Sequence, residues 1–280
     1  MMFNTNSTLS FADSYNSDQK NSAVNSEEEY ILEKQRLAEL MYEAVVSGNN
    51  ESASQYKEEM NRLEKIFLGE NIALNEDNTE VASAYSVPPP SYYFLSNSIH
   101  YPQDEYYYCG PATAKMMLHI HGINKTQSFL AGSNYLCTDA YGETPWFISN
   151  HTDTNDCLMA KTLNSLQSVY YITSPFGANA GKGLTVDQCK AYVMSAVSSG
   201  HCVAVCGTSQ ASGSSHMPNY PNSVIGHWLV IDGYYSNGAY MYILDPAKSS
   251  KVSWSNNITA RYIVSAETLQ AFIGWKGIVW

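Results

Sequence analysis

One feature restricts the fold of this chain more than any other, a cysteine placed where a helix begins. Gln103 is followed by Asp-Glu-Tyr-Tyr-Tyr, then by Cys109-Gly-Pro-Ala and a mostly apolar run that stops at Gly122. Pro111 suits the first turn of a helix and Gly122 the position just past its end, so we expect a helix from Cys109 to about His121. The free N–H groups and the positive dipole end at a helix start favour a thiolate. The sequence therefore predicts that Cys109 is a nucleophile.

A cysteine nucleophile needs a base, and a predicted β-hairpin supplies one. Two apolar runs, residues 225–234 and 239–244, flank a Ser-Asn-Gly turn signal. If the turn is centred on Ser236, His227 faces Asp245 directly; a centre one or two residues later shifts the register by up to three residues. A carboxylate beside an imidazole fixes its tautomer and stabilises the imidazolium. We therefore expect these two side chains to act with the cysteine.

Gln103 is a candidate for stabilising an oxyanion. It lies six residues before Cys109, so its amide N–H could turn back to the site of reaction, with the Cys109 backbone N–H as a second donor. The remaining histidines have no ligand-like spacing with Cys, His or Asp, and we expect neither a metal nor another cofactor. Taken singly, these residues also have ordinary explanations: a buried cysteine, a core histidine and an aspartate in a turn.

Taken together, these residues resemble the papain-fold cysteine peptidases. The stretches Tyr-Cys-Gly-Pro-Ala, Gly-His-Trp-Leu-Val-Ile-Asp-Gly-Tyr and Leu-Asp-Pro are similar to those of bacteriocin-processing (double-glycine leader) peptidases and their stand-alone bacterial relatives, over roughly residues 92–280. The resemblance implies an α+β, papain-like fold, with the nucleophile helix packed on an antiparallel sheet. It also implies a cysteine peptidase that works through a thioacyl-enzyme. The implied roles are nucleophile for Cys109, general acid and base for His227, imidazole orienter for Asp245 and oxyanion donor for Gln103.

The same resemblance suggests where a substrate binds. The Gly-Glu-Thr-Pro-Trp loop is similar to one that those relatives carry beside the cleft, so we expect Thr144, Trp146 and Trp228 to contact a peptide or protein substrate. The papain signature around the cysteine is absent from this chain. Two alternatives stay open: an amidase or acyl transferase on the same fold, and a catalytically inactive surface or binding module.

The N-terminal third differs in composition from the rest. Residues 1–25 are rich in Asn and Ser without periodicity, and we expect disorder there. A capping box at Ser26 and a seam of apolar residues predict an acidic, antiparallel helical hairpin within residues 26–87. A Val-Pro-Pro-Pro spacer then leads into a catalytic domain over residues 88–280. The hairpin is either a tether or an inhibitory pro-segment, the second implying intramolecular inhibition by residues 26–90.

Hydrophobic patterns predict the other elements of the catalytic domain. The run near Thr185 that ends at Gly200 is typical of a helix, and the Cys-Val-Ala-Val-Cys pattern is typical of a strand. The expected helices are 158–166, 185–198 and 266–272, and the expected strands are 168–172, 201–206 and 275–280.

Charge and composition limit the partners and the location. A formal net charge of −11 argues against nucleic acid, because phosphate binding needs a basic face. No apolar run approaches the roughly 20 residues of a membrane span. Only 15% of residues are charged and 22 are tyrosines, a composition typical of secreted proteins, yet the first residues lack a signal-peptide pattern. We expect a secreted or cell-surface bacterial protein whose signal has been removed, with the cytoplasm as the alternative.

Overall fold

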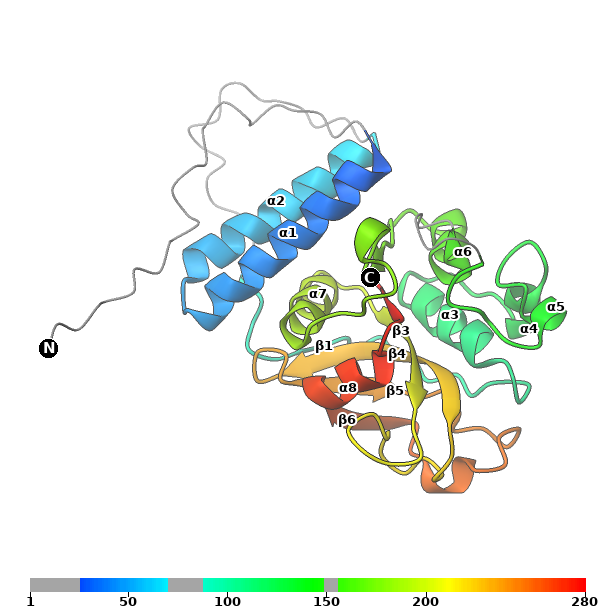
Figure 1. Ribbon diagram of the computed structural model, residues 1–280. Coiled ribbons are helices and arrows are strands. Elements are labelled where there is room, and N and C mark those ends of the chain that lie inside the picture. Colours follow the sequence, from blue (N-terminus) through cyan, green and yellow to red (C-terminus); the bar gives the residue numbers. More distant parts are fainter. Residues whose placement is uncertain (1–25, 70–87, 149–155) are drawn as a thin grey trace, which may run out of the picture.

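The computed structural model describes residues 26–69, 88–148 and 156–280. Helices and an antiparallel sheet form the fold, and a pair of helices lies along one side of it (Figure 1). The predicted disorder of residues 1–25 lies outside the described residues, and so do residues 70–87 of the segment 26–90 to which inhibition was assigned. The helices are α1 Glu27–Val46, α2 Asn50–Phe67, α3 Cys109–Ile120, α4 Gln127–Ala131, α5 Thr138–Tyr141, α6 Leu158–Leu166, α7 Val186–Ser198 and α8 Ala266–Ile273, with 3₁₀ turns η3 Gly177–Asn179 and η4 Ser255–Asn257.

The sheet has seven strands, and every pairing that it contains is antiparallel. Their order is β2-β7-β3-β4-β5-β6, and β1 pairs with the end of β4 beyond the point where β3 stops. The strands are β1 Tyr93–Phe94, β2 Thr173–Ser174, β3 Val203–Ser209, β4 Ile225–Tyr235, β5 Tyr240–Leu244, β6 Arg261–Ser265 and β7 Gly277–Val279. Strand β4 is buried along most of its length because strands flank it on both sides and helices cover it.

Most predicted elements are confirmed within a few residues. Helix α7 begins within one residue of the predicted start, directly after a cap in which Thr185 and Gln188 bond reciprocally. The strand predicted at 168–172 is wrong over most of its length, because only Ile172 at its end joins the sheet, by exchanging backbone hydrogen bonds with Trp280, and β2 itself covers Thr173–Ser174. The physical reason is local: the Asn164 side chain bonds both the N–H and the C=O of Tyr171, at 2.7 and 2.9 Å. Those backbone groups are then not available to a neighbouring strand.

The hairpin between β4 and β5 forms where it was predicted, but its register differs from the simplest expectation. Val230 pairs with Leu244, whereas a turn centred on Ser236 would pair it with Tyr242. The turn is centred later, since Ser236 and Asn237 both adopt positive φ angles and Tyr235 pairs with Tyr240. The Ser-Asn-Gly sequence tolerates these angles. Asp245 therefore lies just past the ladder, diagonal to His227 rather than opposite it.

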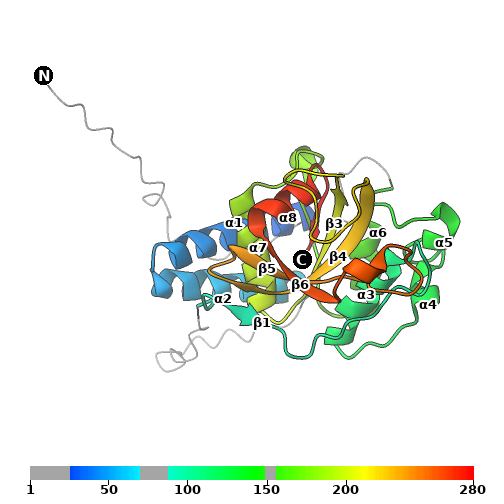
Figure 2. The same cartoon turned by 90° about the horizontal axis from the view of Figure 1, so that it is seen from below.

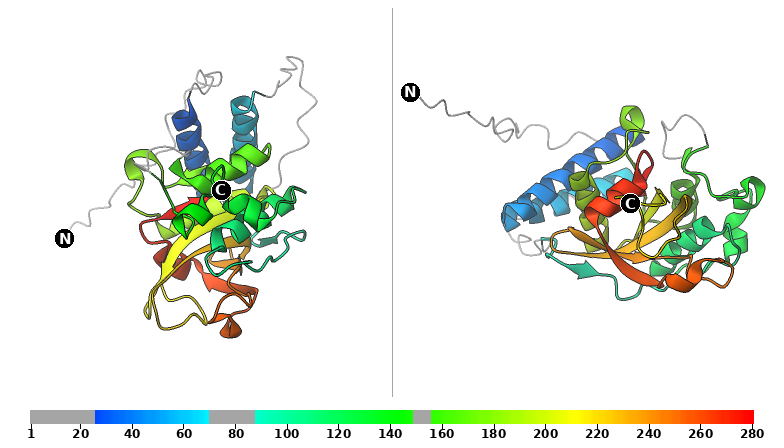
Figure 3. Two further views of the ribbon diagram at one scale, coloured as in Figure 1. Left: turned by 90° about the vertical axis from the view of Figure 1, so that its right-hand side faces the viewer. Right: turned by 60° about the horizontal axis from the view of Figure 1, so that its bottom comes forward.

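The helical pair is packed into the rest of the protein. Helices α1 and α2 run side by side, and α1 also packs along α7 (Figures 1 and 3). Tyr30, Ile31, Leu37 and Met41 have no exposed surface and belong to the same hydrophobic core as the sheet. In Figures 1 and 2, α3 lies on the other side of α7 from the pair. The described part of the pair thus contacts a region away from the start of α3.

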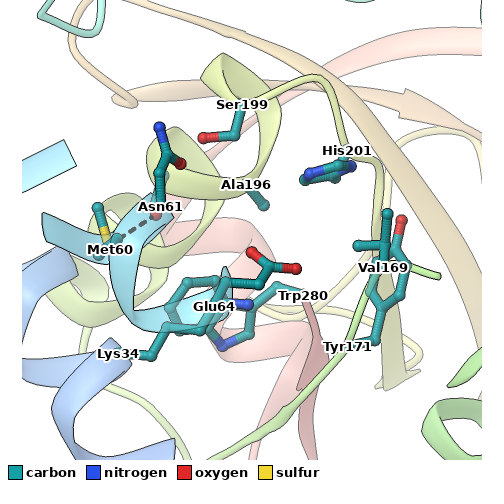
Figure 4. A pocket seen from close by; sticks show the side chains of 11 residues that line it. Lys34, Met60, Asn61, Glu64, Val169, Tyr171, Ala196, Ser199, His201 and Trp280 are labelled. Atoms are coloured by element: carbon teal, nitrogen blue, oxygen red, sulfur yellow. Dashed lines mark hydrogen bonds between the residues drawn. The ribbon is translucent and has the colours of Figure 1, made fainter. Parts of the chain in front are cut away.

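A small cavity lies where the pair meets the rest of the protein. Lys34 and Glu64 from the pair, together with His201 and Trp280, are among its lining residues (Figure 4). Its volume of about 20 Å³ is room for one water molecule. The Lys34 ammonium lies 5.0 Å from the centroid of the Trp280 ring and donates to the Tyr170 carbonyl. Polar contacts thus supplement the apolar packing of the pair.

Candidate active site

The Cys109 side chain sits at the first residue of α3, as predicted, and is half-buried. Its sulfur interacts with the His227 ring, and the backbone N–H groups of Trp228 and Gly110 lie close enough to stabilise its negative charge. Burial alone would raise the pKa of the Cys109 thiol, but these partners outweigh burial and bring the pKa below its ordinary value. The sulfur is therefore disposed to be a thiolate.

Gly110 lets this helix start approach the loop that carries Thr144. A β-carbon on Gly110 would overlap the Thr144 side chain. Thr144 is itself fixed, because its hydroxyl bonds that of Thr138 at 2.6 Å and its carbonyl accepts from the Trp228 indole at 2.8 Å. The close approach thus connects the start of α3 to β4.

Gly110→Ala will destabilise the protein by about 1–3 kcal/mol, because the new methyl group has no room beside Thr144. Urea unfolding measures the loss. Gly226→Ala is the matched control, since a β-carbon at Gly226 meets nothing within 4 Å. Equal stabilities for the two variants would show that α3 and the Thr144 loop are not in close contact.

His227 comes from β4, and its ring is held on three sides. Its Nε2 lies 2.9 Å from Asp245 Oδ1, and both side chains are almost fully buried. The rings of Tyr220 and Trp254 meet it edge-on at centroid distances of 6.1 and 6.3 Å. With Nε2 used by Asp245, Nδ1 is the nitrogen left for the Cys109 sulfur. Cys109, His227 and Asp245 thus form one connected group.

The Asp245 carboxylate has no exposed surface, yet it accepts four hydrogen bonds. Oδ1 accepts from His227 and from the Ala247 backbone N–H at 2.8 Å. Oδ2 accepts from the hydroxyls of Tyr220 at 2.7 Å and Tyr262 at 2.8 Å. Burial would raise the pKa of Asp245, but the His227 charge and these donors bring it below its ordinary value. The carboxylate is therefore ionised.

The pKa of the His227 imidazole is shifted in the opposite direction, upwards. Burial would lower its pKa, but Asp245 on one side and the Cys109 sulfur on the other raise it above its ordinary value. A lowered thiol pKa next to a raised imidazole pKa favours a thiolate–imidazolium pair around neutral pH. This charge state is the reactive form of a cysteine nucleophile.

Gln103 lies near this group but uses its amide elsewhere. Its Nε2 donates to the carbonyls of Glu105 at 2.8 Å and Tyr106 at 2.6 Å, so both amide protons are occupied. Its backbone N–H donates to the Pro246 carbonyl, next to Asp245. Gln103 thus shapes the segment that leads to Cys109. Its role as an oxyanion donor stays a prediction, and it would require one of these bonds to open.

The three predicted substrate-binding residues are buried. Thr144, Trp146 and Trp228 expose 5%, 4% and 1% of their surface. The two indole rings lie 5.5 Å apart, and Trp228 bonds the Thr144 carbonyl. Side chains this deep offer little area to a substrate, so their contacts indicate a supporting role beneath α3. Substrate contact by these residues stays a prediction.

The sequence reasoning missed three aromatic residues around the site. Tyr220 lies in the loop between β3 and β4, Trp254 precedes η4, and Tyr262 lies on β6. None stands next to a predicted motif, and nothing in the local sequence indicates that they meet His227 or Asp245. Tyr262 reaches Asp245 because the sheet order puts β6 beside β5, the strand that Asp245 follows.

The described ranges hold neither a cluster of metal-ligating side chains nor a helix suited to crossing a membrane. No group of three or more His, Cys, Asp and Glu side chains in these ranges could hold a metal ion. None of the helices there combines the length and the hydrophobicity that crossing a bilayer requires.

Comparison with known proteins gives a family match. The sequence model of the peptidase C39-like family matches residues 95–268, well over half of the chain. No curated protein matches. Among solved structures, the chain is similar to a crystal structure from Bacillus anthracis described as a candidate C39-like peptidase, at 14% identity. The likeness covers 67% of this chain and 96% of the other, with a TM-score of 0.41, too low to support an argument.

Proposed function

Since the chain belongs to the peptidase C39-like family, with the papain-like α+β fold predicted for it, we propose that it is a cysteine-type hydrolase that cleaves peptide bonds. One observation carries the proposal: the Cys109 sulfur at a helix start meets the His227 ring, whose far nitrogen is bonded to a buried carboxylate. Nucleophile, base and orienter are thus in contact, in the arrangement that acyl transfer requires.

The chemistry follows from this contact. The Cys109 thiolate attacks the carbonyl carbon of the substrate, an S–C bond forms and the carbonyl electrons move to oxygen. The His227 imidazolium gives its proton to the leaving nitrogen as the C–N bond breaks, which leaves a thioester on Cys109. Water then attacks the thioester while His227 takes its proton, and the thiolate departs. The N–H groups at the start of α3, which lack partners within the helix, would stabilise the oxyanion.

Product analysis tests the reaction class. The full chain is incubated with a mixed peptide library, with and without an added amine, and the products are identified by mass spectrometry. New carboxyl termini in both samples support hydrolysis. Amine adducts that replace them indicate the acyl transferase alternative. Intact peptides, together with an unreactive Cys109, would overturn the proposal in favour of an inactive module.

Asp245→Asn will slow hydrolysis by about tenfold, because a neutral acceptor holds the imidazole with a weaker bond than a carboxylate does. The amide still orients the ring, since the Tyr220 and Tyr262 hydroxyls can rotate to accept from its NH₂ group. Asp245→Ala is the comparison, with an expected loss of at least about 100-fold. Equal rates for the two variants, measured as kcat, would contradict an orienting role.

We propose a secreted or surface location separately. The location is supported by composition alone. Inhibition is disfavoured by the buried side chains of the pair, such as Leu37 and Met41, which occupy the common core rather than a cleft beside Cys109.

A further inference from the structure

Two tyrosine hydroxyls converge on one oxygen of the buried carboxylate. Tyr220 and Tyr262 both donate to Asp245 Oδ2, at 2.7 and 2.8 Å. The other oxygen accepts from His227 and from the Ala247 N–H. Each carboxylate oxygen therefore has two donors, which fixes the plane of the group and the direction in which Oδ1 points.

Each tyrosine is held by a different part of the fold. Tyr220, 5% exposed, comes from the loop between β3 and β4, and its ring centroid lies 4.9 Å from that of Trp254. Tyr262 stands on the edge strand β6, opposite Ile243 of β5. Packing of both rings places the hydroxyls before any substrate arrives. Two independent segments thus fix one carboxylate.

We propose that Tyr220 and Tyr262 are positioning residues, which keep Asp245 ionised and aim its Oδ1 at His227, so that the thiolate–imidazolium pair persists at acidic pH. The inference rests on the proposed function of Cys109 and His227. A carboxylate without exposed surface takes up a proton easily, and donors to its ionised form oppose this. Once Asp245 is neutral, the buried imidazolium loses its counter-charge and the thiolate is lost with it.

The other titratable groups near Asp245 do not keep its carboxylate ionised. His100 Nε2 lies 2.8 Å from the Asp245 backbone carbonyl rather than from its carboxylate. Burial lowers the pKa of His100, although its hydrogen bond to the Asp245 carbonyl and the Asp245 charge act in the opposite direction. Burial next to Asp245 raises the pKa of both tyrosines well above the ordinary value, so they remain donors throughout the working range. Cys109 acts on the His227 ring from the side away from Asp245.

Titration of the Asp245 carboxyl carbon by NMR tests the proposal on the full chain, with the signal assigned by its loss in Asp245→Asn. We expect the pKa of Asp245 to rise by about one unit in Tyr262→Phe and further in Tyr220→Phe/Tyr262→Phe. Iodoacetamide alkylation of Cys109, followed by peptide mass spectrometry, should then lose its reactivity at a higher pH than in the wild type. Tyr234→Phe is the matched control, because it removes a buried hydroxyl that donates to the Pro90 carbonyl.

The outcomes separate this inference from the proposed function. A folded double variant in which the pKa of Asp245 matches that of the Tyr234→Phe control overturns the positioning role. If the double variant does not fold, Tyr262→Phe alone decides, since it changes only an edge strand. A wild-type Cys109 that reacts only at alkaline pH refutes the proposed function, whereas the Asp245 titration still reports on the tyrosines.

Discussion

Cys109→Ala will reduce peptide hydrolysis by about 10⁴-fold or more, because the thioester intermediate cannot form without the sulfur. The fold should be preserved, since alanine is a good residue for the first turn of α3 and the side chain is only half-buried. The rate is measured as kcat/KM on a peptide found in the library experiment, alongside the unfolding midpoint.

The matched control for Cys109→Ala is Cys137→Ala. Cys137 is the other half-buried free thiol in the described part of the chain, and its sulfur contacts the Ser133 carbonyl. Its loss should leave hydrolysis unchanged. Retained activity in Cys109→Ala, or equal losses in the two variants, would refute the nucleophile assignment.

Removal of residues 1–69 will leave a chain that no longer unfolds cooperatively. Tyr30, Ile31, Leu37 and Met41 are fully buried against the rest of the protein. Burial of each such side chain stabilises a fold by roughly 1.5–3 kcal/mol, and four of them rival the ~5–15 kcal/mol of a whole domain. The truncation would also expose the Trp280 ring beneath Lys34. Thermal unfolding followed by near-UV circular dichroism measures the effect.

A pair of point variants tests the same claim without truncation. Leu37→Ala, with no exposed surface, should lower the free energy of unfolding by about 2–5 kcal/mol. Leu32→Ala, on the same helix but 48% exposed, should change it by less than about 0.5 kcal/mol. A truncated chain that unfolds cooperatively and hydrolyses peptides faster than the full chain would instead support the inhibitory pro-segment.

The contact among Cys109, His227 and Asp245 could be predicted from the sequence, because the signals that place these residues are local. Proline and glycine at the two ends of α3 place Cys109 at a helix start, and a turn signal between apolar runs brings His227 near Asp245. The register follows the later turn centre that the sequence left open, shifted by two residues at Val230, and Ser236 itself adopts a left-handed conformation. The contact forms all the same, since an imidazole and a carboxylate can meet diagonally as well as directly across a ladder.

What the sequence could not predict depends on distant packing. The apolar seam of α1 and α2 shows that these helices bury a face, but not that α7 and Trp280 cover it. The burial of Trp146 and Trp228 follows from the closeness of Gly110 to the Thr144 loop, which no spacing encodes. The tyrosines on Asp245 come from a loop and an edge strand, so only the folded sheet brings them together.

The central claim is that His227 makes Cys109 anionic at neutral pH, and the pH dependence of Cys109 alkylation tests it most directly. In the wild type, the rate should reach half its maximum well below the ordinary thiol value of about 8.5. In His227→Ala, the midpoint should move up towards or beyond that value, because only the neighbouring backbone N–H groups and burial then act on the sulfur. Identical midpoints near the ordinary value in both proteins would contradict the account.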